Sequence, residues 1–386
     1  MTFPPLYRTL VDLTGPSPRV PDGAIDWPQM IALARRHKVL PLVAHGVERT
    51  GLAATMPGPA HDALTALRRR LAMRTLRSVR DTVWVAQALR EASIDATAIK
   101  GATVGAAIYG DAALRSPGDI DILIAPADLD RTLIVIDALG YRPLHAGALI
   151  NAERRARLMK HAKDAVFSHP DGRTFLECHW RLHRHPDFMP VAPMLEDRRR
   201  EVTLAGAKLA TLHPVDHFIY LCFHGTKHLW HRLKWLNDIR WILADGAFVD
   251  GDWAAVAERA RELRCAGLVA ASGLLVERLD AIACPAPIRQ LAEDNSAATR
   301  ILRDSLDQQR RFGAAPADPH LSPLDRLRFH YRSNRAAKPD GSGPWPALAS
   351  AFQPNAEHIA AGDPPLGRDA LLALKGYVMP KPADTP

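Results

Sequence analysis

The spacing of apolar residues predicts helices in the first quarter of the chain. From residue 27 onward, apolar positions recur every three to four residues, which is the period of a helix with one buried face. Residues 27–50 predict two short helices, and residues 60–94 predict one long helix because they contain neither Gly nor Pro. We therefore expect an N-terminal helical region over residues 1–94.

The pattern changes at residue 95 to short apolar runs that alternate with helical segments. Asp171-Gly172 lies between two runs rich in β-forming residues, and this dipeptide is a strong hairpin signal. We expect a mixed α/β core over residues 95–200. The predicted elements are strand 96–99, helix 102–109, strand 120–126, helix 127–140, short strand 141–144, helix 151–160, and strands 165–170 and 173–182.

The remainder divides into a helical part and a part rich in turn-forming residues. Helical periodicity returns at 213–246, where Pro214 suits a first helical turn, and continues at 252–282. We assign residues 201–311 to a C-terminal helical domain. Residues 312–386 are rich in Pro, Gly, Ala and Arg, which indicates an irregular segment with short helices. The fold class is therefore α+β, with the sheet flanked by helical regions.

Composition narrows the class of protein. The 386 residues are 47% hydrophobic and 24% charged, as in an ordinary globular chain, and no apolar run is long enough to span a membrane. The first residues lack secretory-signal features. The four cysteines are scattered, without CxxC spacing, which favours reduced thiols. We therefore expect a cytoplasmic protein without a membrane partner.

The positive charge either reflects an arginine-rich composition without a role in binding or favours anionic partners. The formal net charge is +8, so the surface should attract a nucleotide, a nucleic acid or an acidic protein. Within the predicted long helix, a run of arginines is either a solvated face or a nucleic-acid contact. The members of that run are Arg68, Arg69, Arg70, Arg74, Arg77 and Arg80.

Two aspartates interrupt the apolar run GDIDILI at residues 118–124. Because side chains alternate along a strand, Asp119 and Asp121 point to the same side while the intervening isoleucines point into the core. Paired carboxylates repel unless a cation lies between them, and oxygen ligands favour a hard ion such as Mg²⁺. Glu177 becomes the third carboxylate if its strand lies beside 120–126, and Asp164 is the alternative.

Residues just before the aspartates suit a phosphate group. Gly101 opens a helix, where backbone N–H groups and the helix dipole favour anions. Lys100 and Arg115 add positive charge near the same position. Two carboxylate-bound metals together with a triphosphate would support nucleotidyl or phosphoryl transfer.

The segment 99–141 resembles the active-site region of the DNA polymerase β-like nucleotidyltransferase superfamily. It is most similar to a poorly characterised bacterial family with Lys-Gly, Tyr, Arg and Gly-Asp-Ile-Asp in this order. LECHWRL at 176–182 resembles its third-carboxylate strand, and 221–243 resembles its helical signature, so the likeness covers residues 27–270.

The resemblance implies a polymerase β-like core with Asp119, Asp121 and Glu177 as catalytic metal carboxylates. It also places Gly101 at the phosphate turn, where this chain has Ala102 in place of the second Gly or the Ser of many members. Lys100 or Thr103 could compensate. The nucleotide-binding residues expected on these grounds are Lys100, Gly101, Thr103, Arg115, Gly118, Lys227, His228 and Arg232.

Histidines repeat on one face of the predicted helix after residue 213. His217, His224 and His228 are spaced by seven and four residues. Three interpretations stay open for them: packed, hydrogen-bonded histidines, a zinc site, and one wall of the cleft. In the last interpretation, Lys227, His228 and Arg232 contact the triphosphate or the acceptor. His179 either orients a carboxylate or packs.

These features predict a Mg²⁺-dependent nucleotidyltransferase, with Mn²⁺ as an alternative ion and ATP as the expected NTP. It would transfer NMP to a hydroxyl or phosphate and release pyrophosphate. The acceptor stays open among tRNA, a protein, and a small molecule or peptide, and the oligomeric state stays open too. The alternative from another class is a catalytically silent nucleotide-binding regulator or scaffold, and a metal-dependent phosphotransferase is the other enzymatic possibility.

Overall fold

A single seven-stranded sheet lies between helices in the computed structural model, which describes residues 3–116, 118–171, 174–183, 189, 198–315 and 359–360. The strand order is β3-β4-β5-β2-β1-β7-β6. β2 is parallel to β5 and β1 is parallel to β7, and the other neighbours are antiparallel. The strands are β1 (Ala96–Ala98), β2 (Ile120–Ile124), β3 (Arg142–Pro143), β4 (Asp164–Ser168), β5 (Phe175–His179), β6 (Arg199–Leu204) and β7 (Ala207–Leu212).

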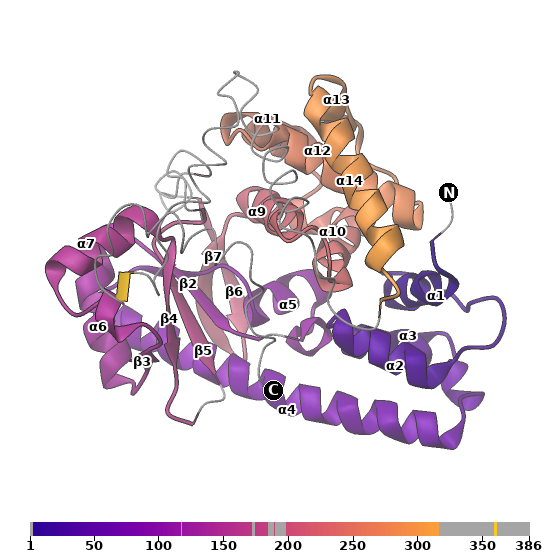
Figure 1. Cartoon of the computed structure of the whole chain (residues 1–386), viewed down its shortest axis with the longest axis horizontal. Helices are drawn as coiled ribbons and strands as arrows, with labels where there is room; N and C mark the ends of the chain where they lie inside the picture. The colour runs from indigo at the N-terminus through magenta and orange to yellow at the C-terminus, as the bar shows by residue number, and fades with distance from the viewer. Residues whose placement is uncertain are drawn as a thin grey trace.

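The N-terminal helices form where the apolar period predicted them. The expected pair at 27–50 is α2 (Trp27–Arg36) and α3 (Leu40–Arg49), and the expected long helix is α4 (Gly58–Glu91). Helix α4 runs along the base of the molecule, beneath the sheet at one end and beneath α2 at the other (Figure 1). A further helix, α1 (Pro5–Thr14), was not predicted.

The mixed α/β core has the predicted order of elements. Its helices are α5 (Ala102–Tyr109), α6 (Leu129–Ala138) and α7 (Ala152–His161). β4 and β5 pair antiparallel as expected for a hairpin, although Gly172 lies outside the described residues. The sheet continues beyond residue 200, where we expected the core to end, because β6 and β7 extend it to Leu212.

The C-terminal helices are shorter than the two predicted segments. They are α9 (Pro214–Lys227), α10 (Leu233–Asp245), α11 (Trp253–Glu262), α12 (Ala266–Asp280), α13 (Ala286–Glu293) and α14 (Ser296–Phe312). The first break follows from packing: a Cβ atom on Gly225 would lie 2.0 Å from the Trp230 ring. The absence of that atom lets Trp230 fold back over the end of α9. Helices α13 and α14 were not predicted.

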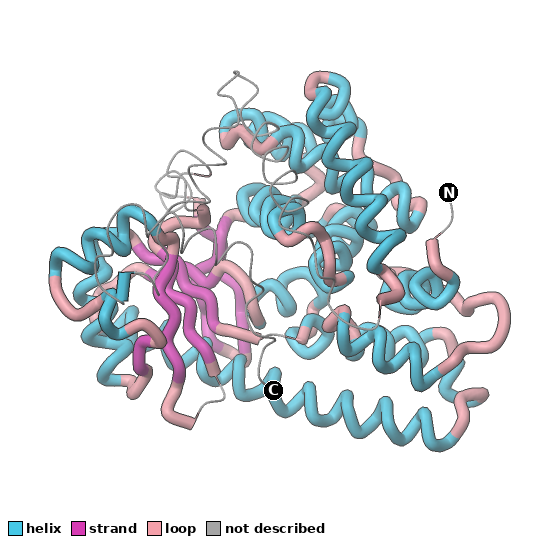
Figure 2. Tube along the Cα trace, in the orientation of Figure 1, coloured by secondary structure: helices cyan, strands magenta, loops and turns pink. Residues whose placement is uncertain are grey.

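Two apolar clusters fix the sheet between the helices. One unites residues of α1–α3 with residues of α9–α14, so the N- and C-terminal helices share a core. The other packs α4, α6 and α7 against the sheet, and it includes Ile120, Ile122 and Ile124 of β2. Leu123 belongs to the first cluster, so the alternate positions of β2, including Asp121, face the helical body. Figure 2 shows that helices lie on both sides of the strands.

Most of the expected C-terminal segment lies outside the described residues. Within it, Ile359 is buried in the cluster beside the sheet. All four cysteines are buried and none forms a disulfide. Among the described helices, none has both the length and the apolar character needed to cross a membrane.

Candidate active site

The register of two parallel strands brings the predicted carboxylates together. β2 pairs with β5 so that Asp121 lies opposite Glu177 and Leu123 lies opposite His179. Ligand atoms of Asp121, Glu177 and His179 all lie within 4.8 Å of one another. Asp121 and His179 are buried and Glu177 is partly exposed. The cluster therefore opens toward solvent on the Glu177 side.

His179 holds the two carboxylates at the centre of this cluster. Its Nε2 atom lies 3.2 Å from Asp121 Oδ1 and 3.2 Å from Glu177 Oε2. A proton on Nε2 satisfies this geometry, since both neighbours are acceptors. Nδ1 faces the other way, 3.6 Å from Asp164 Oδ2 and 3.4 Å from Lys163 Nζ. Of the two interpretations of His179, the structure supports orientation of the carboxylates.

Lys100 supplies a positive charge to the same two carboxylates. It lies two residues after β1 and forms an ion pair with Asp121, and its Nζ lies 3.7 Å from Glu177 Oε2. Burial alone would lower the pKa of Lys100, but Asp121, Tyr220 and Glu177 raise it well above its usual value. Lys100 is therefore charged throughout the physiological range.

Lys100 and His179 lower the pKa of both carboxylates. Burial would raise the pKa of Asp121, but Lys100 and the hydrogen bond from His179 hold it well below its usual range. The same imidazole and Lys100 lower the pKa of Glu177 against the opposing effects of burial and Asp121. Both side chains are thus ionised at neutral pH.

Asp119 lies outside this tight group. It precedes β2, on the same side as Asp121 by strand alternation, and its side chain is exposed. Neighbouring groups that displace water, together with the charges of Asp121 and Glu177, raise the pKa of Asp119. Added positive charge near the three carboxylates would relieve this repulsion.

Asp164 is the less suitable third carboxylate. It lies one strand further from β2, opposite His179 in the β4–β5 register. Burial opposes its ionisation, but Lys163 and His179 lower its pKa, and Lys163 forms an ion pair with it. Glu177 stands directly beside Asp121, whereas Asp164 contacts the far side of the imidazole.

The turn after Lys100 requires glycine. Gly101 has φ 71° and ψ −136°, a conformation that side chains with a Cβ rarely adopt. A Cβ there would lie 3.1 Å from the carbonyl oxygen of Asp119. The missing side chain thus lets the turn approach the start of β2. The Thr103 hydroxyl is buried and donates to Lys100 O at 2.8 Å, which fixes the turn and leaves that hydroxyl unable to contact phosphate.

Arg115 is buried behind this turn. Its Nη1 donates to Gly101 O at 3.1 Å, and its Nε and Nη2 each lie 3.0 Å from a carboxylate oxygen of Asp238. Tyr109 donates to the same carboxylate at 2.9 Å. The side chains of Arg115 and Asp238 are only 3% and 0% exposed. This arrangement favours a positioning role for Arg115 over the direct phosphate contact expected from the sequence.

Lys234 was not among the predicted site residues, although it lies next to the turn. Its Nζ donates to Ser116 O at 2.8 Å, and burial together with Arg115 lowers its pKa well below the usual value. Ser116 has φ 49°, so the loop before Gly118 is held in a strained left-handed conformation. Gly118 itself is exposed.

Helix α9 provides the opposite wall of the site. Tyr220 is buried, and its electrostatic neighbours include Lys100, Asp121 and Glu177. One turn further along, His224 lies within reach of the Lys100 charge. Burial and nearby cations lower the pKa of both His224 and His228 well below the usual value, so both imidazoles are neutral at pH 7.

The histidine-rich segment separates into two environments. His217 is buried and donates from Nε2 to Ile99 O at 2.9 Å, as the packing interpretation predicts. His228 stacks on Trp235 with ring centroids 4.8 Å apart, and Arg232 lies over the same indole at 6.0 Å. Lys227 is partly exposed at the end of α9. In the described part of the chain, the one group of three metal-ligating side chains contains none of these histidines.

The donor set at β2 and β5 fits a divalent cation. Two ionised carboxylates and one imidazole converge there, and a third carboxylate lies close by. We predicted a site made of oxygen ligands alone; the structure brings His179 Nε2 within reach as well, and this nitrogen would bind an ion only after releasing the proton that it donates to the carboxylates. Imidazole is compatible with Mn²⁺ and later transition metals as well as with a hard ion held by the carboxylates.

Comparison with known proteins agrees with this geometry. The model of a family described as uncharacterised nucleotidyltransferases matches residues 23–279. This span contains β1, β2, β5, α9 and α10, and it includes every site residue discussed above. It also agrees with the resemblance found in the sequence over residues 27–270. No curated protein and no solved structure matches the chain.

Proposed function

Because the chain belongs to this family of uncharacterised nucleotidyltransferases, we propose that it transfers NMP from an NTP to a hydroxyl or phosphate acceptor and releases pyrophosphate. The observation that carries the proposal is the β2–β5 register, which sets Glu177 beside Asp121 next to the Lys100-Gly101 turn. The catalytic carboxylates would be Asp119, Asp121 and Glu177, with Mg²⁺ as the ion and Mn²⁺ as a substitute.

Each polar group near the turn has a distinct task in this proposal. Asp121 and Glu177 would hold a divalent cation that supplies positive charge to the triphosphate and favours ionisation of the acceptor oxygen. His179 keeps both carboxylates oriented. Lys100 is charged and lies next to both carboxylates, so it can bind a phosphate oxygen. The Gly101 turn offers backbone N–H groups at the start of α5.

The neutral ring surface on α9 and α10 suits the rest of the nucleotide. His228 and Trp235 are stacked, and His224 lies 4.6 Å from His228 between ring centroids. Uncharged aromatic rings offer flat faces to a base, which stacks on such rings. Lys227, His228 and Arg232 would contact the nucleotide or the acceptor from this side. ATP is the nucleotide we would test first.

The reaction can be tested by following label from each α-³²P-labelled NTP with Mg²⁺ or Mn²⁺. The acceptor pools are total tRNA, lysate protein and a small-molecule extract. We expect Asp121→Asn and Glu177→Gln to lower transfer by about 100-fold or more, because they remove ligands of the cation that would neutralise the negative charge of the transition state.

Asp164→Asn is the matched control. It neutralises a partly buried carboxylate on the neighbouring strand that lies outside the group of three, so we expect it to retain most of the activity. Equal transfer by wild type and Asp121→Asn would contradict the proposal. If Mn²⁺ and NTP bind but no pool is labelled, a silent nucleotide-binding protein is the better description.

A further inference from the structure

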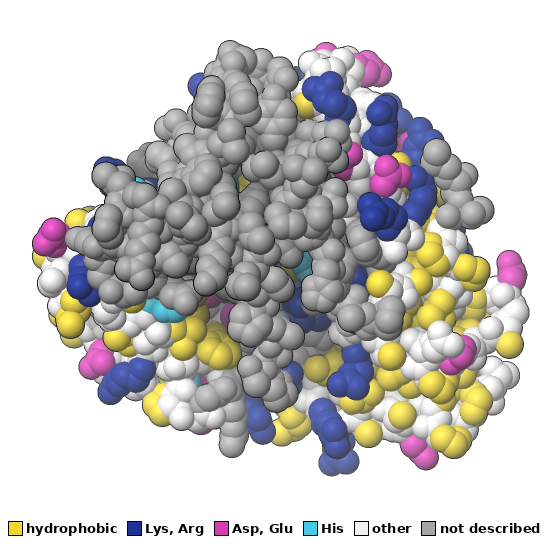
Figure 3. Space-filling model, in the orientation of Figure 1, with side chains coloured by type: hydrophobic (Ala, Val, Ile, Leu, Met, Phe, Trp, Pro, Cys, Tyr) yellow, Lys and Arg dark blue, Asp and Glu magenta, His cyan; other side chains and the backbone are white. Residues whose placement is uncertain are grey.

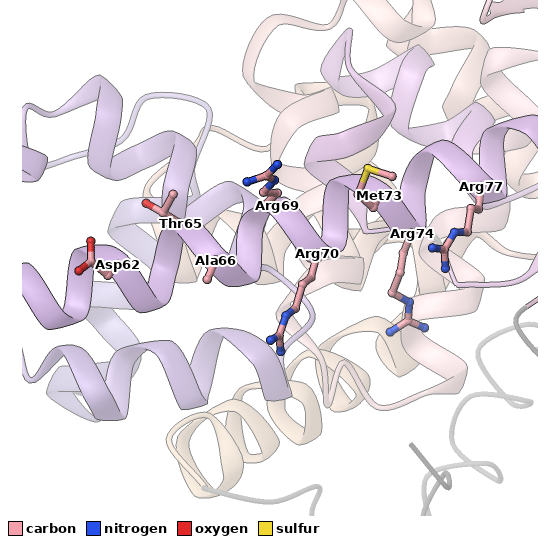
Figure 4. Close-up of a pocket in the computed structure, with 8 residues that line it drawn as sticks. All are labelled: Asp62, Thr65, Ala66, Arg69, Arg70, Met73, Arg74 and Arg77. Atoms are coloured by element: carbon pink, nitrogen blue, oxygen red, sulfur yellow. The ribbon is translucent and has the colours of Figure 1, made fainter.

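A second, basic groove lies on α4, apart from the carboxylates. Its volume is about 700 Å³ and it is open to solvent. Figure 4 shows its lining, which comes entirely from residues 62–77 of this helix. The lining residues are Asp62, Thr65, Ala66, Arg69, Arg70, Met73, Arg74 and Arg77.

The arginines of this groove lack partners in the part of the chain that the structure describes. Elsewhere on α4, Arg68 forms an ion pair with Glu48 and Arg80 forms one with Asp81. No such pair is made by the four groove arginines, all of which are exposed. The groove thus presents four guanidinium groups against the single carboxylate of Asp62, and it attracts an anion with several charges.

The spacing of the arginines suits a chain of anionic groups. Arg70, Arg74 and Arg77 extend to the same side of α4 (Figure 4), because residues four and seven apart share a helical face. They follow one another at about 6 Å and about 4.5 Å along the axis. Guanidinium groups bind phosphate through paired hydrogen bonds, so this row offers successive phosphate contacts.

Apolar side chains accompany the positive charge. Met73 is 50% exposed and Leu76 is 61% exposed on the same stretch of α4. A nucleic acid has bases and sugars that can cover such side chains while its phosphates meet the arginines. Lys and Arg side chains also lie along the lower edge of the face seen in Figure 3, where α4 runs.

The groove is connected to the catalytic end of the sheet by α4 itself. Asp81, one turn beyond Arg77, accepts a hydrogen bond from Thr174 at 2.6 Å, and Thr174 precedes β5, which carries Glu177. Along these elements the chain rises by about 16 Å from Arg70 to Asp81 and by about 10 Å from Thr174 to Glu177. The helix that carries the groove is thus in direct contact with the start of the strand that carries Glu177.

We propose that the arginine row on α4 binds the phosphodiester backbone of a nucleic acid. Binding of a nucleic acid to this row does not depend on the proposed transfer reaction. Transfer of NMP to the bound nucleic acid would, and that part rests on the proposed function.

The test is binding of a fluorescein-labelled 24-nucleotide RNA hairpin, and of the DNA hairpin of the same sequence, followed by anisotropy at several salt concentrations. EDTA is present and NTP is left out, so the result does not depend on catalysis. For Arg70→Gln/Arg74→Gln/Arg77→Gln we expect the log–log salt slope to fall by about 2. The Kd at 0.1 M salt should then weaken by about 100-fold.

The matched control is Arg264→Gln/Arg300→Gln/Arg303→Gln, which removes the same charge from exposed positions outside the groove. We expect it to bind almost as tightly as wild type, as should Asp121→Asn. Tighter binding of one of the two hairpins shows whether the groove prefers RNA or DNA. Equal loss in the two triple variants, or none in either, would overturn the proposal.

A protein or lipid partner is distinguished in the same assay. Polyglutamate that competes as well as the hairpin at equal charge, or vesicles with 30% phosphatidylserine that bind with the same dependence on the groove arginines, would overturn the nucleic-acid assignment. Failure of labelled transfer with retained hairpin binding would count against the proposed reaction alone.

Discussion

Gly101→Ala should damage the site more than it damages the fold. The backbone at this position has φ 71° and ψ −136°, and holding an L-residue there costs about 1–3 kcal/mol. The new Cβ would also lie 3.1 Å from Asp119 O, so the turn must shift by a few tenths of an ångström. We expect the free energy of unfolding to fall by about 2 kcal/mol.

The shift should have a larger effect on transfer, because Gly101 joins Lys100 to the start of α5. Misplacement of a binding group by about 1 Å can cost 100-fold in rate, and we expect a loss of at least tenfold in the folded protein. Urea unfolding and labelled transfer measure the two effects separately.

Gly110→Ala is the control for this change. Gly110 also has positive φ, 70°, but no atom of the residues that the structure describes lies within 4 Å of an added Cβ, so the cost is about 1 kcal/mol. Transfer should be nearly unchanged. If the two alanine variants unfold alike and transfer alike, the close approach of the turn to Asp119 has no functional role.

Three further predictions concern the groups around this turn. Asp238→Asn should lower the free energy of unfolding by about 3–5 kcal/mol, because it leaves buried Arg115 without its counter-charge; a loss below about 1 kcal/mol in urea titration, typical of exposed pairs, would refute this. Burial lowers the pKa of His217 to about 4, so the unfolded chain binds more protons and stability should fall as pH decreases from about 6.5 to 4. His217→Gln should flatten that fall by up to about 3 kcal/mol, and an unchanged pH profile would contradict it. His179→Ala should weaken Mn²⁺ binding by about 10- to 100-fold in calorimetry, whereas unchanged affinity would show that the imidazole neither binds the ion nor orients Asp121.

Elements with a strong apolar period could be predicted from the sequence. The apolar period of α4 indicates a helix, and the alternation along β2 indicates a strand. Strands β6 and β7 were missed because neither has a clean apolar alternation: RREVTL forms the edge strand and keeps exposed polar residues, and AKLATL lies next to it. Their connection through Ala205 and Gly206, both with positive φ, is a tight hairpin turn that gave no strong signal in the sequence.

The sequence predicted which carboxylates would gather, but it did not specify their contacts. Strand alternation places Asp119 and Asp121 on one face, and Glu177 was expected to join them if its strand lay beside 120–126, as the resemblance also implied. The contact of His179 with both Asp121 and Glu177 depends on the β2–β5 register, which no local pattern specifies. The role of Arg115 was also hidden, because its partner Asp238 is 123 residues away.

These long-range contacts join the helical body to the catalytic turn. Asp238 belongs to α10, and its carboxylate holds Arg115, which in turn donates to Gly101 O. Lys234, on the same helix, binds Ser116 O in the loop that leads to Asp119. Both ends of the site, the turn before α5 and the loop before β2, are thus anchored to α10. Because buried, paired groups cannot shift independently without exposing a charge, a displacement of α10 would carry the turn and the loop with it. The helical body is therefore coupled to the two segments that flank the carboxylates.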